Sequence, residues 1–132
     1  MHLIDKLAWL LIKDKKLLVA RSKNKLLFYL PGGKREPGES DQQALIREIK
    51  EEISVELAIE SIQYAHTTEA PADGKDDGTK VKLGCYFADY YGDIAANSEI
   101  DELLFIDSQQ RALCSAATIK VIDWLAQQQL IN

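Results

Sequence analysis

The segment of residues 33–55 constrains this chain more than any other part of its sequence. It contains a glycine turn, then an isolated glutamate, and then an Arg-Glu pair followed by two further glutamates. Ser40 and Gln43 form a capping-box pattern, which predicts a helix that begins after Ser40 and includes residues 44–53. Three residues spaced four positions apart would give this helix an apolar stripe, namely Leu45, Ile49 and Ile53.

Three glutamates of the predicted helix share one of its faces. Glu48, Glu51 and Glu52 are three and four positions apart, so they lie on neighbouring turns of the same side. Like charges on one face destabilise a helix unless cations bind there, and Mg²⁺ suits such oxygen ligands best when phosphates complete its shell. Arg47 precedes Glu51 by one turn and could hold that carboxylate through a paired hydrogen bond. If the Glu-rich helix is considered alone, the alternative to a metal site is an ordinary solvated helix surface.

The same segment resembles the sequence box of the Nudix hydrolase family. That box reads Gly, five residues, Glu, seven residues, and then Arg-Glu-U-x-Glu-Glu-x-Gly-U, where U is a bulky aliphatic residue. Ser54 departs from the pattern because the family has glycine there, which puts the turn that ends the helix in question. The residues on the pattern are Gly33, Glu39, Arg47, Glu48, Ile49, Glu51, Glu52 and Val55.

The resemblance implies a hydrolase that cleaves a nucleoside diphosphate linked to another moiety. The implied reaction is displacement of a phosphoryl group by water, which requires charge neutralisation on the diphosphate and a base. The implied cofactor is Mg²⁺, with Mn²⁺ as an alternative. The implied fold is the Nudix fold of the α+β class, an α/β/α sandwich with a central mixed β-sheet. The order of apolar segments independently favours an α+β protein whose helices cover a mixed sheet.

The resemblance also assigns the metal ligands. Glu48 and Glu52 would be the principal ligands, and Glu51 would assist them. A backbone carbonyl of Gly32 or Gly33 would complete the shell, because glycine lets the backbone approach a ligand closely.

The remaining catalytic candidates lie around and beyond the box. Arg47 would orient Glu51, and Glu39 would support the turn that leads into the helix. Nudix enzymes commonly use one more glutamate as a ligand or base. Glu102 is favoured over Glu99 because it lies at the mouth of a predicted strand, and an ordinary loop acid is the alternative for either.

Substrate binding is assigned to polar loops outside the metal ligands. Arg21 belongs to a basic loop, residues 21–25, that leads to the glycine turn, and its planar fork suits a phosphate or a base edge. Gly33 and Lys34 are the other candidates. Specificity is expected from this loop and from two more, residues 70–79 and 92–101, because the box would contact only the diphosphate and metals that all substrates share.

The sequence leaves the substrate open between alternatives. The short chain resembles the MutT-like branch, which cleaves nucleoside triphosphates to monophosphate and pyrophosphate in nucleotide pool sanitation. Pro71, sixteen residues past the box, is a hint of an ADP-ribose or nucleotide-sugar pyrophosphatase. A non-catalytic nucleotide-binding module is the alternative from another class. The intact glutamates of the box argue against that last reading.

Composition restricts the remaining possibilities. A chain of 132 residues is expected to form one domain, residues 1–132, with a substantial core. The net charge of −5 argues against a nucleic-acid or membrane-surface binder, and the family resemblance implies a small nucleotide as the partner. Cys85 and Cys114 have no metal-binding spacing, which favours reduced thiols and a cytoplasmic location. No pattern for export or for a membrane span is found, and the sequence does not indicate the oligomeric state.

The predicted elements follow from apolar runs and turn residues. Residues 6–12 and 16–20 are predicted to form a hairpin. The other predicted strands are residues 26–30, 55–59, 62–66, 81–89 and 103–106, and a closing helix is predicted over 116–129.

Overall fold

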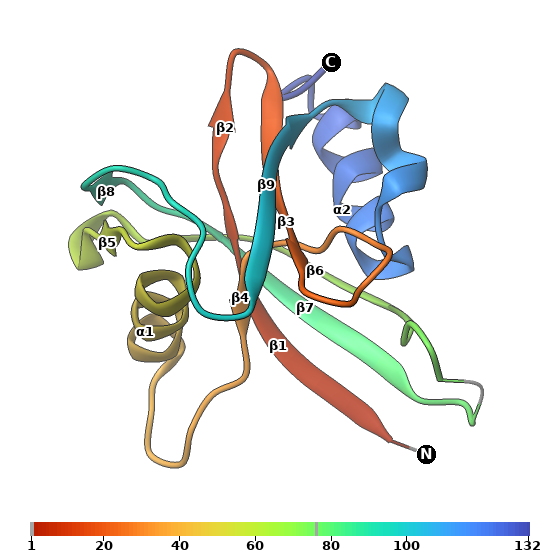
Figure 1. The fold of residues 1–132 in the computed structure, drawn as a ribbon, viewed down its shortest axis with the longest axis horizontal. Coiled ribbons are helices and arrows are strands. Elements are labelled where there is room, and N and C mark those ends of the chain that lie inside the picture. Colours follow the sequence, from red (N-terminus) through yellow and green to blue (C-terminus); the bar gives the residue numbers. More distant parts are fainter. Residues whose placement is uncertain (1, 76) are drawn as a thin grey trace.

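The computed structural model describes residues 2–75 and 77–132 and arranges them as strands between two helices (Figure 1). Helix α1 spans Asp41–Ile53 and helix α2 spans Ala116–Gln127, and the two lie on opposite sides of the strands. This arrangement confirms the predicted α+β class and the Nudix sandwich. Within the described ranges, neither helix is long and apolar enough to cross a membrane.

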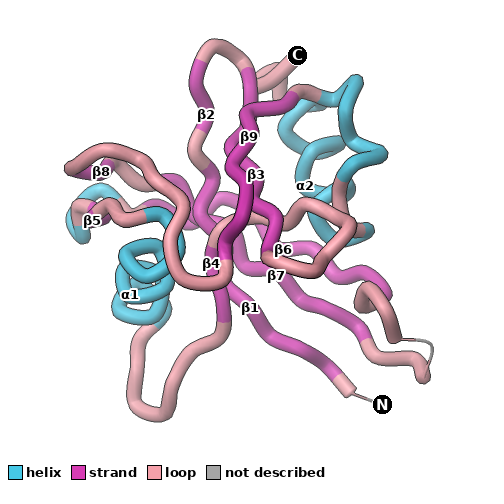
Figure 2. The backbone as a smooth tube through the Cα atoms, in the orientation of Figure 1, coloured by secondary structure: helices cyan, strands magenta, loops and turns pink. Residues whose placement is uncertain are grey.

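The strands divide between a larger and a smaller sheet, with a short ribbon beside them (Figure 2). The larger sheet is mixed, in the order β4-β1-β7-β6, with β1 and β7 parallel and the other pairs antiparallel. The smaller sheet is antiparallel, in the order β2-β3-β9, and β5 pairs with β8. The bounds are β1 Leu3–Leu10, β2 Ile12–Lys13, β3 Lys16–Ser22, β4 Gly32–Gly33, β5 Glu56–Leu57, β6 Gln63–Pro71, β7 Lys80–Phe87, β8 Tyr90–Tyr91 and β9 Ile100–Ile106. Two 3-10 turns complete the chain, η1 Ile59–Ser61 and η2 Ser108–Leu113.

One predicted hairpin was confirmed only near its turn, and one predicted strand was wrong. The hairpin between residues 6–12 and 16–20 is reduced to the two pairs of β2 with β3, because β1 belongs to the other sheet. Residues 26–30 form only isolated bridges, at Phe28 and Tyr29, since Leu26 is 91% exposed and Pro31 has no N–H for a sheet ladder.

Other boundaries moved by a few residues. Strand β6 continues to Pro71 and β9 begins at Ile100, so both predicted specificity loops are shorter than expected. Residue 76 of the predicted 70–79 loop lies outside the described residues. Helix α2 ends at Gln127, two residues before its predicted end.

Helix α1 is held by a core that it shares with β1 and β3. The predicted apolar stripe of α1 is fully buried, and it packs with strand residues from both sheets. Burial of each such side chain contributes about 2 kcal/mol, so this core fixes which side of α1 faces solvent. The largest buried members are Leu7, Trp9, Leu18, Leu45, Ile49 and Ile53.

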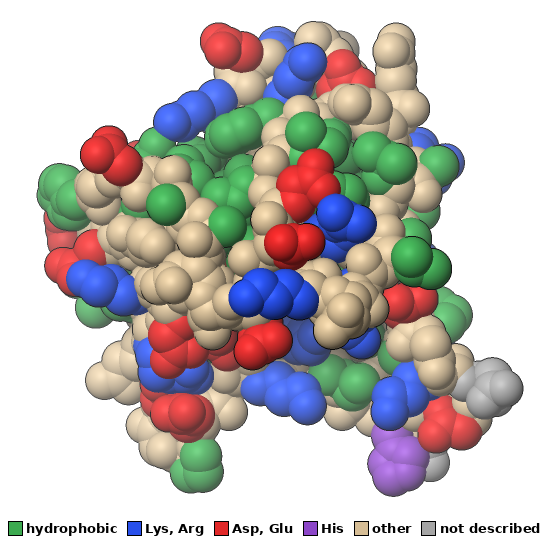
Figure 3. All heavy atoms as spheres, viewed as in Figure 1, with side chains coloured by type: hydrophobic (Ala, Val, Ile, Leu, Met, Phe, Trp, Pro, Cys, Tyr) green, Lys and Arg blue, Asp and Glu red, His purple; other side chains and the backbone are tan. Residues whose placement is uncertain are grey.

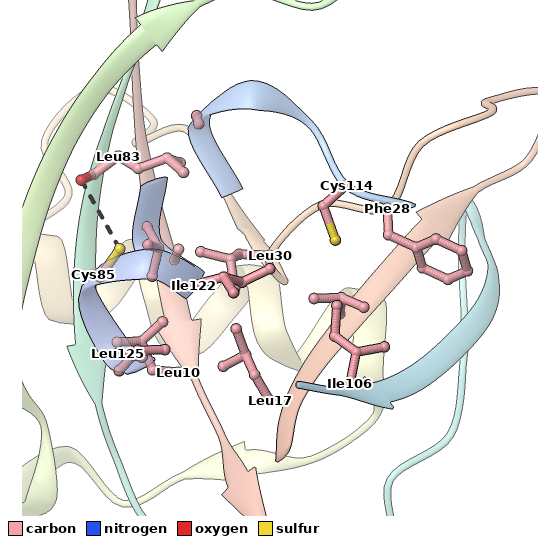
Figure 4. Close-up of a cluster of buried hydrophobic side chains, with 14 of the residues drawn as sticks. Leu10, Leu17, Phe28, Leu30, Leu83, Cys85, Ile106, Cys114, Ile122 and Leu125 are labelled. Carbon is pink, nitrogen blue, oxygen red and sulfur yellow. Dashed lines mark hydrogen bonds between the residues drawn. The ribbon is translucent and has the colours of Figure 1, made fainter. Parts of the chain in front are cut away.

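A second core joins α2 to both sheets (Figure 4). Leu10, Leu17, Ile106, Ile122 and Leu125 point toward one another at its centre. Both cysteines belong to this core as free, buried thiols, in agreement with the prediction. Burial raises the pKa of the Cys85 thiol to about 12 and that of Cys114 to about 11, so both stay protonated.

Ser54 ends α1 in the left-handed conformation that the family glycine would adopt. Its φ is 70°, its N–H donates to the Lys50 carbonyl, and its hydroxyl donates to the carbonyl of Ala95 at 3.1 Å. The left-handed conformation costs a non-glycine residue roughly 1 kcal/mol, and a hydrogen bond returns a similar amount. Serine therefore forms the same turn as glycine and adds an attachment for the segment after β8.

Substitutions at Ser54 should separate these two effects. We expect Ser54→Ala to be less stable than Ser54→Gly by about 1 kcal/mol, because both lose the hydroxyl bond and only alanine keeps the strain. Urea unfolding midpoints measure the difference. Equal stability of the two variants would contradict the role given to the left-handed turn.

Candidate active site

Two consecutive glycines bring the backbone of β4 against β1 and against α1. Gly32 pairs with Ala8 and Gly33 with Leu7. A Cβ on Gly32, whose φ is +146°, would lie 2.0 Å from the Leu7 carbonyl oxygen. A Cβ on Gly33 would lie 2.1 Å from Oε2 of Glu48. At Gly32 both the positive φ and the Leu7 backbone require glycine, and at Gly33 the absence of a Cβ leaves room for the Glu48 carboxylate directly beside the backbone.

Glu48 and Glu52 are the two glutamates of the α1 acidic face whose pKa values burial raises. The Glu52 carboxylate accepts a hydrogen bond from the backbone N–H of Gly32 at 3.0 Å. Burial nevertheless raises the pKa of Glu52 to about 7, and the nearby Glu48 and Glu51 charges act in the same direction. Burial also raises the pKa of Glu48, against the effect of Arg47. A bound cation would oppose both shifts, because it favours the ionised form of each carboxylate.

The donor set fits a hard divalent cation that is completed by substrate. In the described part of the chain, no three His, Cys, Asp or Glu side chains gather closely enough to hold a metal ion without other ligands. Mg²⁺ is usually bound by one or two carboxylates together with waters and substrate phosphates. Glu48 and Glu52, next to the Gly32–Gly33 backbone, provide such a partial set, while Glu51 is 55% exposed.

Arg47 forms a bidentate pair with Glu39 across the turn that precedes α1. Its Nε lies 2.7 Å from Oε2 and its Nη2 2.9 Å from Oε1 of Glu39, and Nη2 also donates to the Lys34 carbonyl. Glu39 accepts a further bond from the N–H of Glu36. Arg47 and this N–H together lower the pKa of Glu39 to about 2. The pair therefore fixes the loop between β4 and α1.

The predicted paired hydrogen bond between Arg47 and Glu51 was wrong. Their closest ion-pair distance is 3.7 Å, and Arg47 Nη1 lies at a similar 3.6 Å from Glu48. Glu39 occupies the two donors that form the planar fork, so only Nη1 remains for the acids on the helix. Arg47 thus supplies positive charge between Glu48 and Glu51 and fixes neither in position.

The two glutamates outside the box lie at the start of β9. Glu102 forms an ion pair with Arg21 on the paired strand β3, at 2.7 Å. Glu99 accepts a bond from the N–H of Lys23 through its carbonyl, and its carboxylate has no hydrogen-bond partner among the described residues. The segment before them is attached to the end of α1, since the N–H of Asn97 donates to the Glu52 carbonyl. Of the two acids, Glu102 is therefore held by an ion pair, and Glu99 forms none with the residues that the structure describes.

A cleft of about 230 Å³ opens beside the box. Glu52 and Gly32 line it together with Ile100 of β9 and residues at the start of α2. Three lysines also line it, from separate parts of the chain: Lys6, Lys25 and Lys75. Burial, and next the charge of Lys34, lowers the pKa of Lys6, although Glu52 acts in the opposite direction. Anionic groups of a ligand would therefore meet positive charge next to the carboxylates.

The cleft contains residues that the sequence did not indicate. Lys6 and Tyr29 belong to predicted strands and were given no role in substrate binding, and Asp73 was included only as part of the expected specificity loop of residues 70–79, although all three line the cleft. Arg21, the predicted substrate contact, instead pairs with Glu102 and lies over the Phe28 ring at 5.5 Å. Of the basic residues in the same loop, Lys25 lines the cleft, together with Ser22. The sequence therefore identified the loop that borders the cleft. Which side chain of the loop faces the cleft depends on the course of the backbone, which the sequence does not give.

Comparison with known proteins shows that the chain matches one protein family over nearly its whole length. The family model described as the NUDIX domain matches residues 5–124. A CTP pyrophosphohydrolase of Escherichia coli (strain K12) is 36% identical over 73 residues, a match that spans about half of each chain, 52% here and 54% there.

Solved structures match a larger share of the chain than this relative does. The solution structure of the E. coli ORF135 protein has a TM-score of 0.74 at 26% identity and covers 97% of this chain and 92% of its own. The crystal structure of a MutT NUDIX hydrolase from Burkholderia pseudomallei has a TM-score of 0.76 at 18% identity, with 93% and 98% covered. The second of these similarities concerns the fold alone.

Proposed function

The chain belongs to the Nudix hydrolase family, and from this premise we propose that it hydrolyses nucleoside triphosphates to monophosphate and pyrophosphate. The observation that carries the proposal is the cleft that joins Glu52 and Gly32 to three lysines. A nucleotide with several phosphates supplies the negative charge that such a lining recognises. The relative named CTP pyrophosphohydrolase supports the same class of substrate.

Each group of residues has a distinct task in this proposal. Glu48 and Glu52 would hold the metal with the Gly32 or Gly33 carbonyl, and Glu51 would assist. Bound Mg²⁺, or Mn²⁺ as the alternative, neutralises phosphate charge and lowers the pKa of water. Lys6, Lys25 and Lys75 would bind and orient the phosphates. The Arg47–Glu39 pair would keep the glycine turn at a fixed distance from the helix.

The surface charge supports a small nucleotide as the partner, which is the class of partner that the family resemblance implies. On the face shown in Figure 3, acidic and basic side chains alternate, and positive charge forms no broad area. We retain the cytoplasmic location as part of the same proposal, since the two buried thiols suit it.

A second candidate is an ADP-ribose or nucleotide-sugar pyrophosphatase, because Pro71, the residue behind that alternative, lines the cleft. One screen separates the candidates. The protein is incubated with Mg²⁺ and each nucleoside triphosphate, ADP-ribose, nucleotide sugars and dinucleoside polyphosphates, and products are resolved by chromatography. Monophosphate and pyrophosphate from triphosphates alone are expected. Preferential cleavage of ADP-ribose would favour the second candidate, and no cleavage of any compound would leave the binding-module alternative.

Lys25 and Lys23 provide a matched test of the cleft. Both are exposed lysines of one loop, and only Lys25 lines the cavity. We expect Lys25→Ala to raise KM about tenfold with kcat less affected, because it removes a charge that binds phosphate throughout the reaction. Lys23→Ala should leave KM within about twofold. Equal effects of the two variants on KM would show that the side of the cleft formed by Lys25 does not contact the substrate.

A further inference from the structure

Tyr29 and Asp73 form a polar pair on the wall of the cleft that the proposed chemistry does not use. The Tyr29 hydroxyl donates to Oδ2 of Asp73 at 2.5 Å, and both residues line the cavity. The backbone of Tyr29 is fixed to β3, since it exchanges two hydrogen bonds with the backbone of Ala20. Burial and the Asp73 carboxylate raise the pKa of Tyr29, so the hydroxyl remains a donor.

The bond to Tyr29 leaves one oxygen of Asp73 available. Asp73 has no ion pair, and its Oδ1 no hydrogen bond, with any residue in the described ranges. A carboxylate oxygen can only accept hydrogen bonds at neutral pH, so it selects a ligand group that carries N–H or O–H. The Tyr29 bond orients the carboxylate, which makes that selection directional.

The register of the larger sheet places Asp73 toward one end of the cleft and the glycine turn toward the other. Gly32 lies opposite Ala8 of β1, whereas Pro71 is aligned through Lys80 of β7 with Leu3. Five residues of β1 correspond to about 16 Å at roughly 3.3 Å per residue. Asp73 follows Pro71 by two residues, which places it toward the Leu3 end of the cleft, whereas the glycine turn beside Glu52 lies toward the Ala8 end. An extended nucleotide with its phosphates at Glu52 would bring its base toward Asp73.

We propose that Asp73, oriented by Tyr29, is a specificity-determining residue that accepts a hydrogen bond from the exocyclic amino group of the substrate's nucleobase. This inference deepens the proposed function and rests on it for the presence of a nucleotide in the cleft. Carboxylates recognise the amino group of cytosine in the same way in protein–DNA contacts. A base with a carbonyl at that position would present a lone pair to the carboxylate and be rejected.

Two pairs of nucleotides isolate this contact. CTP carries an exocyclic amino group at the ring position where UTP carries a carbonyl. ATP and ITP differ from each other in the same way. Binding is measured by calorimetry in EDTA, which prevents metal-dependent turnover. We expect the amino member of at least one pair to bind about ten- to a hundredfold more tightly, and Asp73→Asn to reduce that ratio to within about threefold. The ratio is used because removing one negative charge from the cleft changes the attraction for the triphosphate, which both members of a pair share, by the same factor.

Asp77→Asn is the matched control, since it makes the same change in the same loop. Asp77 bonds to Thr79 within the loop and does not line the cleft, so its variant should keep the parental ratio. Tyr29→Phe should lower the ratio by releasing the carboxylate, while the Ala20 backbone bonds preserve the wall. The proposal is overturned if neither pair discriminates in the parent, or if the discrimination persists in Asp73→Asn. Triphosphate hydrolysis without discrimination would overturn this inference alone, and discrimination without hydrolysis would overturn only the proposed reaction.

Discussion

Replacing Glu52 by glutamine is expected to reduce kcat/KM by a factor of about 10³ or more. Glu52 is the box carboxylate that both lines the cleft and contacts the glycine turn. Glutamine keeps an oxygen to accept the Gly32 N–H and loses the charge that a divalent cation requires. Because metal stabilisation supplies several kcal/mol of the barrier reduction and each 1.36 kcal/mol is tenfold in rate, the loss should span several powers of ten.

Stability measurements on the same variant keep folding and catalysis apart. The folded pKa of Glu52 is about 7, against an ordinary 4.5, so the folded state binds this proton more tightly than the unfolded state. The resulting stabilisation is complete below about pH 4.5 and is lost as the pH rises through about 7. In EDTA, Glu52→Gln should therefore gain about 1–3 kcal/mol relative to the parent between pH 5 and pH 8. Thermal unfolding at both pH values measures this difference.

Glu56→Gln is the control for the activity measurement. Glu56 is an exposed acid on β5 that pairs with Lys50 and lies outside the cleft lining. Its variant should retain activity within about twofold. Full activity of Glu52→Gln, or of the parent with excess EDTA, would refute a metal-dependent role for this carboxylate.

The helix of the box could be predicted from sequence because its determinants are local. Ser40 and Gln43 form the predicted capping box in the structure, and the apolar stripe is buried as expected. Spacings of three and four residues fix which side chains share a helix face before any tertiary contact exists. The pairing of Arg47 with Glu39 could not be predicted, because this contact is not set by helix spacing. Glu39 lies eight residues before Arg47, and the irregular turn that brings it close to the helix has no sequence periodicity.

The cleft could not be predicted because it depends on pairings between distant segments. Leu3 pairs with Lys80, and this parallel register brings Lys6 and the loop after β6 to the same cavity. An apolar run indicates a strand and says nothing about its partner or its sheet. For the same reason β1 was joined to β3 as a hairpin, although the structure places β1 between β4 and β7.

Replacing Arg47 by alanine is expected to reduce kcat/KM about 10²-fold by releasing the loop before α1. Arg47 makes three hydrogen bonds to this loop, two to Glu39 and one to the Lys34 carbonyl. Without them the Gly32–Gly33 backbone is no longer fixed against the helix acids, and small displacements of a catalytic group cost about this factor. Arg47→Lys should not restore activity, because an ammonium group cannot form the bidentate contact with a carboxylate.

A double-mutant cycle with Glu39→Ala tests whether the loss arises through that partner. If Arg47 acts by holding Glu39, the double variant should be little worse than either single one. Arg111 provides the matched control, since it forms an equally close bidentate pair with Asp123 on α2, away from the box. Arg111→Ala should leave kcat/KM within about twofold. Additive losses in the cycle, or full activity of Arg47→Lys, would show that the guanidinium acts on Glu48 and Glu51 by charge alone and not by fixing the loop.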